Sequence, residues 1–190
     1  LDNCELVTSL NKSAFHDPLT GLPNRTRMIE LLDATLANPR RAGSVLALVD
    51  LDHFSETNDA LGHHFGDLLL VAVGQRLKSR LAPGLEIGRI GGDIFCLLGE
   101  TDALQPAQIQ ALFRESFRID GQDVLVSSTL GLVRLVEHDG SGADALKDAD
   151  IALKRAKSQQ RAGHFYFSRS MGVEIRERVR MMHALRSGFQ

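Results

Sequence analysis

The stretch RIGGDIFCLLG, residues 89–99, decides the fold of this 190-residue chain. Two apolar runs lie on either side of Gly91-Gly92, and one carboxylate, Asp93, follows the glycines directly. Glycine readily adopts the positive φ angles that a tight turn between antiparallel strands requires. The stretch therefore predicts a hairpin with strands over 86–90 and 94–98, and Asp93 lies just before the second strand.

Helices and strands are predicted on both sides of this hairpin. The continuous apolar run 44–49 indicates a buried strand that ends at Asp50. The turn-rich segment 17–25 leads into a helix that ends near residue 37, and Pro23 suits the first turn of that helix. The remaining patterns predict a loop with His53, His63 and His64, helices over 65–80, 106–116, 143–160 and 171–185, a second hairpin with strands 117–120 and 123–136, and a strand over 164–167.

This order mixes helices with antiparallel pairs of strands, which favours an α+β fold with helices packed on one antiparallel-rich sheet. The chain has 190 residues, 43% of them hydrophobic, and is long enough for one domain with a sizeable core. Its formal net charge of −2 gives no strong attraction to nucleic acid or to an anionic membrane. We therefore expect neither as a partner of this segment.

The compartment can also be inferred from the sequence. No apolar run reaches the length of a membrane span and no signal peptide is present, so we expect a cytoplasmic domain. Cys4 and Cys96 are expected to be ordinary thiols in a reducing compartment, with Cys96 buried. Because the sequence starts at Leu1 rather than Met, we expect a piece of a longer protein, in which a membrane anchor or sensor can lie upstream.

Three carboxylates gather around the hairpin and the buried strand. Asp50 and Asp52 end the strand and point to the same side, and Asp93 begins the neighbouring strand. Magnesium is commonly held by one or two carboxylates together with substrate phosphates, so Asp50 and Asp93 are candidates for one metal site. Aspartate at strand ends and turns also bonds its own backbone, and the pattern alone leaves both interpretations open. The three histidines have no further Cys or His in register and are interpreted as structural rather than as zinc ligands.

Five motifs together resemble the GGDEF family of diguanylate cyclases. They are DPLTGLPNR at 17–25, VDLDHF at 49–54, NDALGH at 58–63 with Gly66-Asp67, RIGGDIF at 89–95 and ADIALKRAK at 149–157. The resemblance covers roughly residues 15–168, which leaves 1–14 as an upstream connector. It further implies that residues 169–190 form a connector helix toward an adjoining EAL phosphodiesterase domain.

The resemblance implies a palm-type fold shared with nucleotidyl cyclases, and two GTP molecules joined across a homodimer into cyclic di-GMP. It implies that Mg²⁺ (or Mn²⁺) is bound by Asp50, the backbone carbonyl of Leu51 and Asp93, and that Asp93 assists deprotonation of the attacking hydroxyl. The remaining implied roles are guanine recognition by Asn58 and Asp67, phosphate binding by Lys157 and Arg161, and support of the hairpin by Arg89. Apart from the resemblance, the lack of side chains at Gly91 and Gly92 would let a phosphate approach the backbone closely.

Each of these roles has a structural alternative. Lys157 and Arg161 lie near the C-terminus of a predicted helix, where cations interact favourably with the helix dipole. Asp67 suits a helix N-terminus for the same reason, and Asn58 suits a turn. For these four residues, the resemblance is what favours the nucleotide-binding interpretation.

The sequence also departs from the family pattern. Ile94 stands where the family signature has a second acid, and Ser55 stands where active relatives carry a lysine. Lys154 replaces a frequent tyrosine, Gln160 replaces a usual glycine, and residues 82–85 lack the Arg and Asp of the inhibitory product site. Loss of one charged partner from a phosphoryl-transfer site can lower the rate by orders of magnitude.

These observations predict a degenerate GGDEF domain that binds GTP with magnesium, cyclises it weakly or not at all, and regulates an adjoining phosphodiesterase. The first alternative is an active diguanylate cyclase, because Asp50 and Asp93 are retained. The second is a dimerisation or interaction module that binds no nucleotide. A palm-type polymerase is disfavoured because the chain is short and has no excess of basic residues.

Overall fold

A central five-stranded sheet organises the protein, and the computed structural model describes residues 14–187. The strand order is β2-β3-β1-β6-β7. The pairs β2–β3, β1–β3 and β1–β6 are antiparallel, and β6–β7 is parallel. The strands are β1 (Ser44–Leu51), β2 (Glu86–Gly91), β3 (Ile94–Glu100), β6 (Ser128–Arg134) and β7 (His164–Tyr166).

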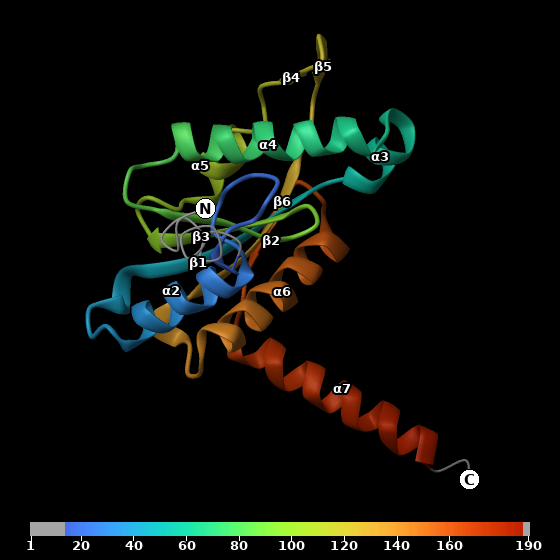
Figure 1. Ribbon diagram of the computed structural model, residues 1–190. Helices are drawn as coiled ribbons and strands as arrows, with labels where there is room; N and C mark the ends of the chain where they lie inside the picture. The colour runs from blue at the N-terminus through green and yellow to red at the C-terminus, as the bar shows by residue number, and fades with distance from the viewer. Residues whose placement is uncertain (1–13, 188–190) are drawn as a thin grey trace.

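Helices cover both faces of this sheet (Figure 1). On one face, α4 (His63–Arg80) and α5 (Pro106–Ala111) pack on the sheet, and the side chains of Val45, Ala47 and Val49 meet them in one core cluster. On the other face, α2 (Arg25–Ala37) and α6 (Gly142–Gln159) cover Leu46 and Leu48 in a second cluster. Because β1 is buried on both faces, residues 45–49 at its centre are all apolar. The predicted α+β architecture, with a mostly antiparallel sheet flanked by helices, is confirmed.

The hairpin that decides the fold is present as predicted. Gly91 has φ 150° and Gly92 has φ 51°, and the ladder closes on the pair Gly91 and Ile94. The buried strand, the helix that ends at Ala37 and the amphipathic helix α6 also lie where the patterns indicate. A capping box between Ser141 and Asp144 starts α6.

The segment between β1 and α4 was predicted as a loop, and this prediction is wrong. It forms a helix, α3 (Phe54–Leu61), which starts after His53 in the left-handed conformation at φ 60°. His63 and His64 are the first two residues of α4. The helix α3 has only eight residues, most of them polar, and none of them is fully buried, so no apolar run marks it in the sequence.

Three further boundaries differ from the prediction. Pro23 precedes the N-cap Asn24 rather than lying in the first turn of α2. The helix α5 ends at Ala111, because the carbonyls of Leu112, Glu115 and Ser116 accept hydrogen bonds from the guanidinium of Arg76. The expected second hairpin is split into a two-stranded sheet and the separate strand β6. That sheet pairs β4 (Phe117–Ile119) with β5 (Gln122–Val124).

The last helix, α7 (Arg169–Ser187), projects away from the sheet (Figure 1). Met171 at its start is buried, whereas Val179, Met181 and Met182 are exposed. No helix among residues 14–187 is long and apolar enough to cross a membrane. Cys96 is buried, and burial raises the pKa of its thiol to about 12, so this thiol is unreactive. Cys4 and residues 1–13 of the predicted connector lie outside the described residues.

Candidate functional site

Most of the predicted site residues converge at one edge of the sheet, where β1 ends, β3 begins and α6 ends. Asp50 lies opposite Ile94 in the β1–β3 ladder, and the Leu51 amide donates to the Asp93 carbonyl at 3.2 Å. The backbone of Asp93 is therefore held directly beside the last residues of β1. Of the two carboxylates predicted for one metal site, Asp50 lies on β1 and Asp93 lies in the turn directly before the neighbouring strand β3.

Asp50 has one oxygen engaged and one free. Its Oδ2 lies 2.6 Å from Nζ of Lys157, whereas its buried Oδ1 has no hydrogen-bond partner among the described residues. Burial raises the pKa of this carboxyl above its ordinary value, the hydrogen bond from Lys157 opposes that rise, and the charges of Asp93 and Asp52 add to it. A buried oxygen without a hydrogen-bond partner destabilises the folded state unless a ligand interacts with it.

This orphaned oxygen fits a hard divalent cation. Within residues 14–187, no group of three or more His, Cys, Asp or Glu side chains forms a ready-made metal site. Magnesium accepts such a sparse donor set when substrate phosphates and water supply the remaining ligands. Asp50, the Leu51 carbonyl and Asp93 are the groups that would hold the ion, and the bound ion would neutralise phosphate charge.

Asp52 lies two residues further and has a different environment. Its carboxylate accepts hydrogen bonds from Oγ of Ser127, Oγ1 of Thr129 and the amide of Ala162. Arg161 lies 3.7 Å away. Asp52 is thus fully engaged, whereas Asp50 retains a free oxygen.

The two cations predicted to bind phosphate lie beside these carboxylates. Lys157 is on the last turn of α6 and contacts Asp50, and Arg161 follows the helix and faces Asp52. Their side chains are 32% and 50% exposed, so both can be reached by a ligand. Lys154 lies on the exposed side of α6 and pairs with Asp150 at 2.6 Å.

The predicted guanine-binding residues lie on α3 and the start of α4. Asn58 Oδ1 is buried and accepts no hydrogen bond from the part of the chain that the structure describes. It lies against Gly66, where any Cβ would overlap it. Asp67 follows Gly66 on α4 and is exposed, and Ser55 is exposed on the first turn of α3. Gly66 was not predicted as a site residue, and its place in the motif Gly66-Asp67 was the only signal.

Arg89 stabilises the turn between β2 and β3. Its Nε and Nη2 donate to the carbonyl of Gly92 at 2.9 and 2.7 Å, and Nη1 donates to Asp17 at 2.8 Å. Burial alone would raise the pKa of Asp17, but hydrogen bonds from Thr20 and from Arg89 hold it below its ordinary value. Asp17 is a residue that sequence reasoning missed, although it begins the motif at 17–25.

Ile94 places an apolar side chain beside the carboxylates. Directly opposed residues of an antiparallel pair project to the same face, so Ile94 and Asp50 share one. Ile94 is half-buried at the edge of the second core cluster. It lines a cavity of about 300 Å³ together with Leu48, Ile90, Leu146, Arg25 and Lys147.

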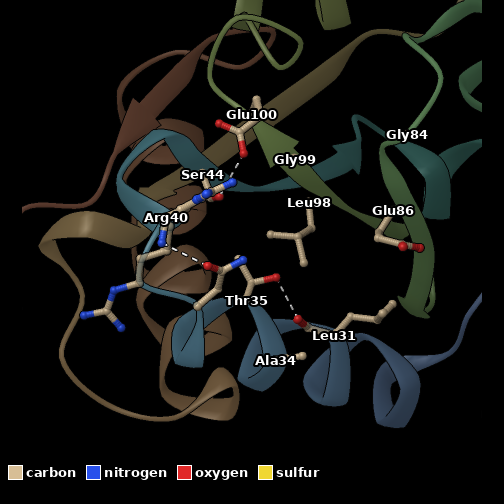
Figure 2. A pocket seen from close by; sticks show the side chains of 12 residues that line it. Leu31, Ala34, Thr35, Arg40, Ser44, Gly84, Glu86, Leu98, Gly99 and Glu100 are labelled. Carbon is tan, nitrogen blue, oxygen red and sulfur yellow. Dashed lines mark hydrogen bonds between the residues drawn. The ribbon is translucent and has the colours of Figure 1, made fainter.

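A larger cavity, of about 520 Å³, lies at the opposite end of β1. Its walls come from the end of α2, the start of β2 and the end of β3, with Leu98 between Glu86 and Glu100 (Figure 2). Ser44 Oγ lies 3.3 Å from Glu100 at its rim. None of the predicted site residues lines this cavity.

Comparison with known proteins shows which family this sequence matches. The family model described as "Diguanylate cyclase, GGDEF domain" matches residues 14–163. The chain is 35% identical to the bifunctional diguanylate cyclase/cyclic di-GMP phosphodiesterase MucR of Pseudomonas aeruginosa, over 97% of this chain and 29% of MucR. It is 38% identical to the diguanylate cyclase TpbB of the same organism, over 80% of this chain and 37% of TpbB. The chain thus spans less than two fifths of either relative.

A solved structure shows the same fold. The GGDEF domain of TpbB from Pseudomonas aeruginosa superposes with a TM-score of 0.77 at 34% identity. The match covers 85% of this chain and 99% of that domain.

Proposed function

The chain belongs to the GGDEF family of diguanylate cyclase domains, and from that premise we propose that it binds GTP with magnesium or manganese but makes little or no cyclic di-GMP. Asp50 carries this proposal: one of its oxygens is buried without a partner and the other is held by Lys157. A cation bound to the free oxygen would give that oxygen a partner and balance the charge of Asp50. Lys157 would then be available to a nucleotide phosphate.

The guanine end of the proposed site rests on α3 and α4. Asn58 retains an unpartnered oxygen, which can accept from an N–H group of a purine edge, and the exposed carboxylate of Asp67 is a second acceptor. Guanine offers N–H donors on its Watson–Crick edge that adenine lacks at the same positions. We therefore expect the domain to prefer GTP over ATP.

Impaired catalysis is proposed from two positions. Ile94 lies beside Asp50 where the family signature carries an acid, and an apolar side chain neither binds metal nor moves a proton. Ser55 on α3 brings no positive charge to the triphosphate. Positioned charges supply most of the stabilisation in phosphoryl transfer, so the loss of two such groups lowers the rate strongly.

We propose a regulatory role from the names of two relatives and from the projecting helix α7. MucR is named as a bifunctional cyclase and phosphodiesterase, and a second relative, 36% identical over 96% of this chain and 24% of its own length, is named the cyclic di-GMP phosphodiesterase NbdA of Pseudomonas aeruginosa. We propose that residues 15–168 form the nucleotide-binding domain and that 169–190 connect it to an EAL phosphodiesterase domain. The projecting helix α7 suits this connection.

The first test is a titration of the domain with GTP and with ATP, with and without magnesium. We expect GTP to bind more tightly with the metal, and ATP to bind at least about tenfold more weakly than GTP. Asp67→Ala should reduce that preference without unfolding the domain, because Asp67 is exposed. Asp59→Ala, on the exposed side of α3, is the matched control. Equal affinity for both nucleotides, or no effect of metal, would contradict the proposed binding of GTP with magnesium, and binding of neither nucleotide would favour an interaction module.

Product analysis then separates a degenerate domain from an active cyclase. Robust cyclic di-GMP formation by the unmodified domain would establish the active enzyme, which the retained Asp50 and Asp93 allow. In the longer protein, phosphodiesterase activity should change when GTP is added. Phosphodiesterase activity that stays unchanged at saturating GTP would contradict the regulatory proposal.

A further inference from the structure

The role of Asp52 is not explained by metal or nucleotide binding. Asp52 is 4% exposed, and both oxygens of its carboxylate accept hydrogen bonds from the protein, so neither lacks a partner as Oδ1 of Asp50 does. Ser127 and Thr129 donate at 2.6 Å each, and both distances are short enough for charge-assisted hydrogen bonds. A buried carboxylate with such partners organises the backbone and side chains around it.

The segment that Asp52 organises is the turn between α6 and β7. The amide of Ala162 donates to Oδ2 of Asp52 at 3.1 Å and to Oγ1 of Thr129 at 3.0 Å. Ala162 has a φ of 59°, a conformation that a residue with a Cβ adopts only when its surroundings hold it there. The carbonyl of Ala162 is fixed as well, by the side-chain amide of Gln110 at 2.8 Å.

This turn carries Arg161 directly and lies just beyond Lys157. Arg161 Nη1 lies 3.7 Å from Oδ1 of Asp52, which draws the guanidinium toward the sheet edge where Asp50 lies. The side chain is half-exposed, and a free arginine loses much rotamer entropy when a ligand immobilises it. A guanidinium already held near the site loses less on binding.

We propose that Asp52 is a positioning residue for the triphosphate end of the site, acting through the Ala162 turn and Arg161. The proposal rests on the proposed binding of GTP. Asp52 fixes the turn by its hydrogen bonds and orients Arg161 by its charge, and it touches neither metal nor nucleotide. Its effect must therefore depend on the phosphates of the ligand and not on the guanine.

The test compares GTP with GMP, which shares the guanine and lacks the two outer phosphates. In the presence of magnesium, Asp52→Asn should weaken GTP binding about tenfold and GMP binding by less than about twofold. The asparagine can retain the hydroxyl contacts and lacks the charge that faces Arg161. Asp123→Asn removes an exposed carboxylate that pairs with Arg118, and should change neither affinity.

A double-mutant cycle shows whether Asp52 acts through Arg161. In the Arg161→Ala background, Asp52→Asn should lower GTP affinity by less than about twofold, because the residue it positions is absent. Amide exchange of Ala162 in the nucleotide-free domain provides an independent readout, and Asp52→Ala should speed it. If both Asp52 variants unfold, Thr129→Val removes one hydrogen-bond donor to Asp52 with little change of shape. This variant should also lower the affinity for GTP relative to the affinity for GMP.

The outcomes separate this inference from the proposed function. If the unmodified domain binds GTP and the Asp52 variants lose GTP and GMP affinity equally, the positioning role is overturned and the proposed function stands. If the losses of GTP affinity caused by Asp52→Asn and by Arg161→Ala are fully additive, the positioning role is overturned as well. If the unmodified domain does not bind GTP, both proposals fail.

Discussion

At the scale of single residues, two aspartates at the end of β1 have opposite environments. Asp50 lies on β1 and Asp52 follows its last residue, yet both oxygens of Asp52 accept hydrogen bonds whereas Asp50 has a buried oxygen without a partner among residues 14–187. Burying that oxygen of Asp50 without a hydrogen bond lowers the stability of the folded protein at a site suited to a ligand. Functional sites commonly carry such a cost, which the rest of the fold offsets.

The cost at Asp50 should be measurable as a dependence of stability on pH. Because the pKa of Asp50 is raised in the folded protein, the folded state holds a proton that the unfolded chain releases between the ordinary and the raised pKa. The stability that Asp50 contributes is therefore fully present below its ordinary pKa and is lost as pH rises through the raised one. Asp50→Asn should raise the melting temperature near neutral pH by roughly 2–4 °C, the shift expected for about 1 kcal/mol in a domain of this size.

Thermal unfolding of the metal-free protein across pH checks this prediction. The difference between Asp50→Asn and the unmodified protein should shrink as pH falls well below the ordinary pKa of an aspartate, where Asp50 is protonated in both states. The exposed variant Asp123→Asn controls for general effects of removing a charge. A variant that is less stable than the unmodified protein at neutral pH would contradict a raised pKa.

At the scale of elements, the contact between α3 and α4 forms the proposed guanine site. The two helices meet through Gly62, which has φ 88° and serves as C-cap of the first and N-cap of the second. Asn58 then packs on Gly66, where the absence of a side chain lets the helices approach closely. The local geometry of Asn58 therefore depends on a glycine of the neighbouring helix.

Gly66→Ala should displace Asn58 and reduce the preference for GTP over ATP by roughly tenfold. The new Cβ would overlap Oδ1 of Asn58, which is the far end of a flexible side chain, so the fold should survive. Gly74→Ala on the same helix is the matched control, since its Cβ would meet Leu22 at 3.1 Å and lies away from Asn58. Nucleotide competition measures the preference, and an unchanged preference in Gly66→Ala would argue against guanine binding by Asn58.

At the scale of the whole molecule, the chemistry proposed for the family needs two domains. One GTP would be held by each half-site, and the half-sites must face each other for the two molecules to react. We propose that the end of the sheet that carries Asp50, Asp93 and Lys157 would meet its counterpart in a homodimer. Activity measurements must therefore control the association of subunits.

Restoring the missing groups should restore activity only in combination. Ile94→Glu alone should help little, because Ser55 still leaves phosphate charge uncompensated. The pair Ile94→Glu with Ser55→Lys should gain more in log rate than the sum of the single changes, since both groups act on one transition state. Cyclic di-GMP formation by tethered subunits measures this. Absence of product from the tethered double mutant would mean that other groups have been lost, and strictly additive gains would contradict a shared transition state.

The sequence by itself determined the features that depend on neighbours along the chain. The glycine pair required a turn, the apolar run of β1 required burial, and the spacing of apolar residues in α6 required a helix with one covered face. Turn chemistry and periodicity are local, so they can be read before the fold is known. The family motifs are local in the same sense, which is why most of the candidate site could be named from them.

Only the tertiary structure decided which of these groups touch. Asp52 reaches Ser127 and Ala162 across 75 and 110 residues of sequence, and Arg89 reaches Asp17 across 72. The pairing of Lys157 with Asp50, the packing of Asn58 on Gly66 and the helix α3 likewise depend on elements that meet after folding. No periodicity encodes such contacts, because each is set by how helices and strands pack in space and by which buried polar groups must then find partners.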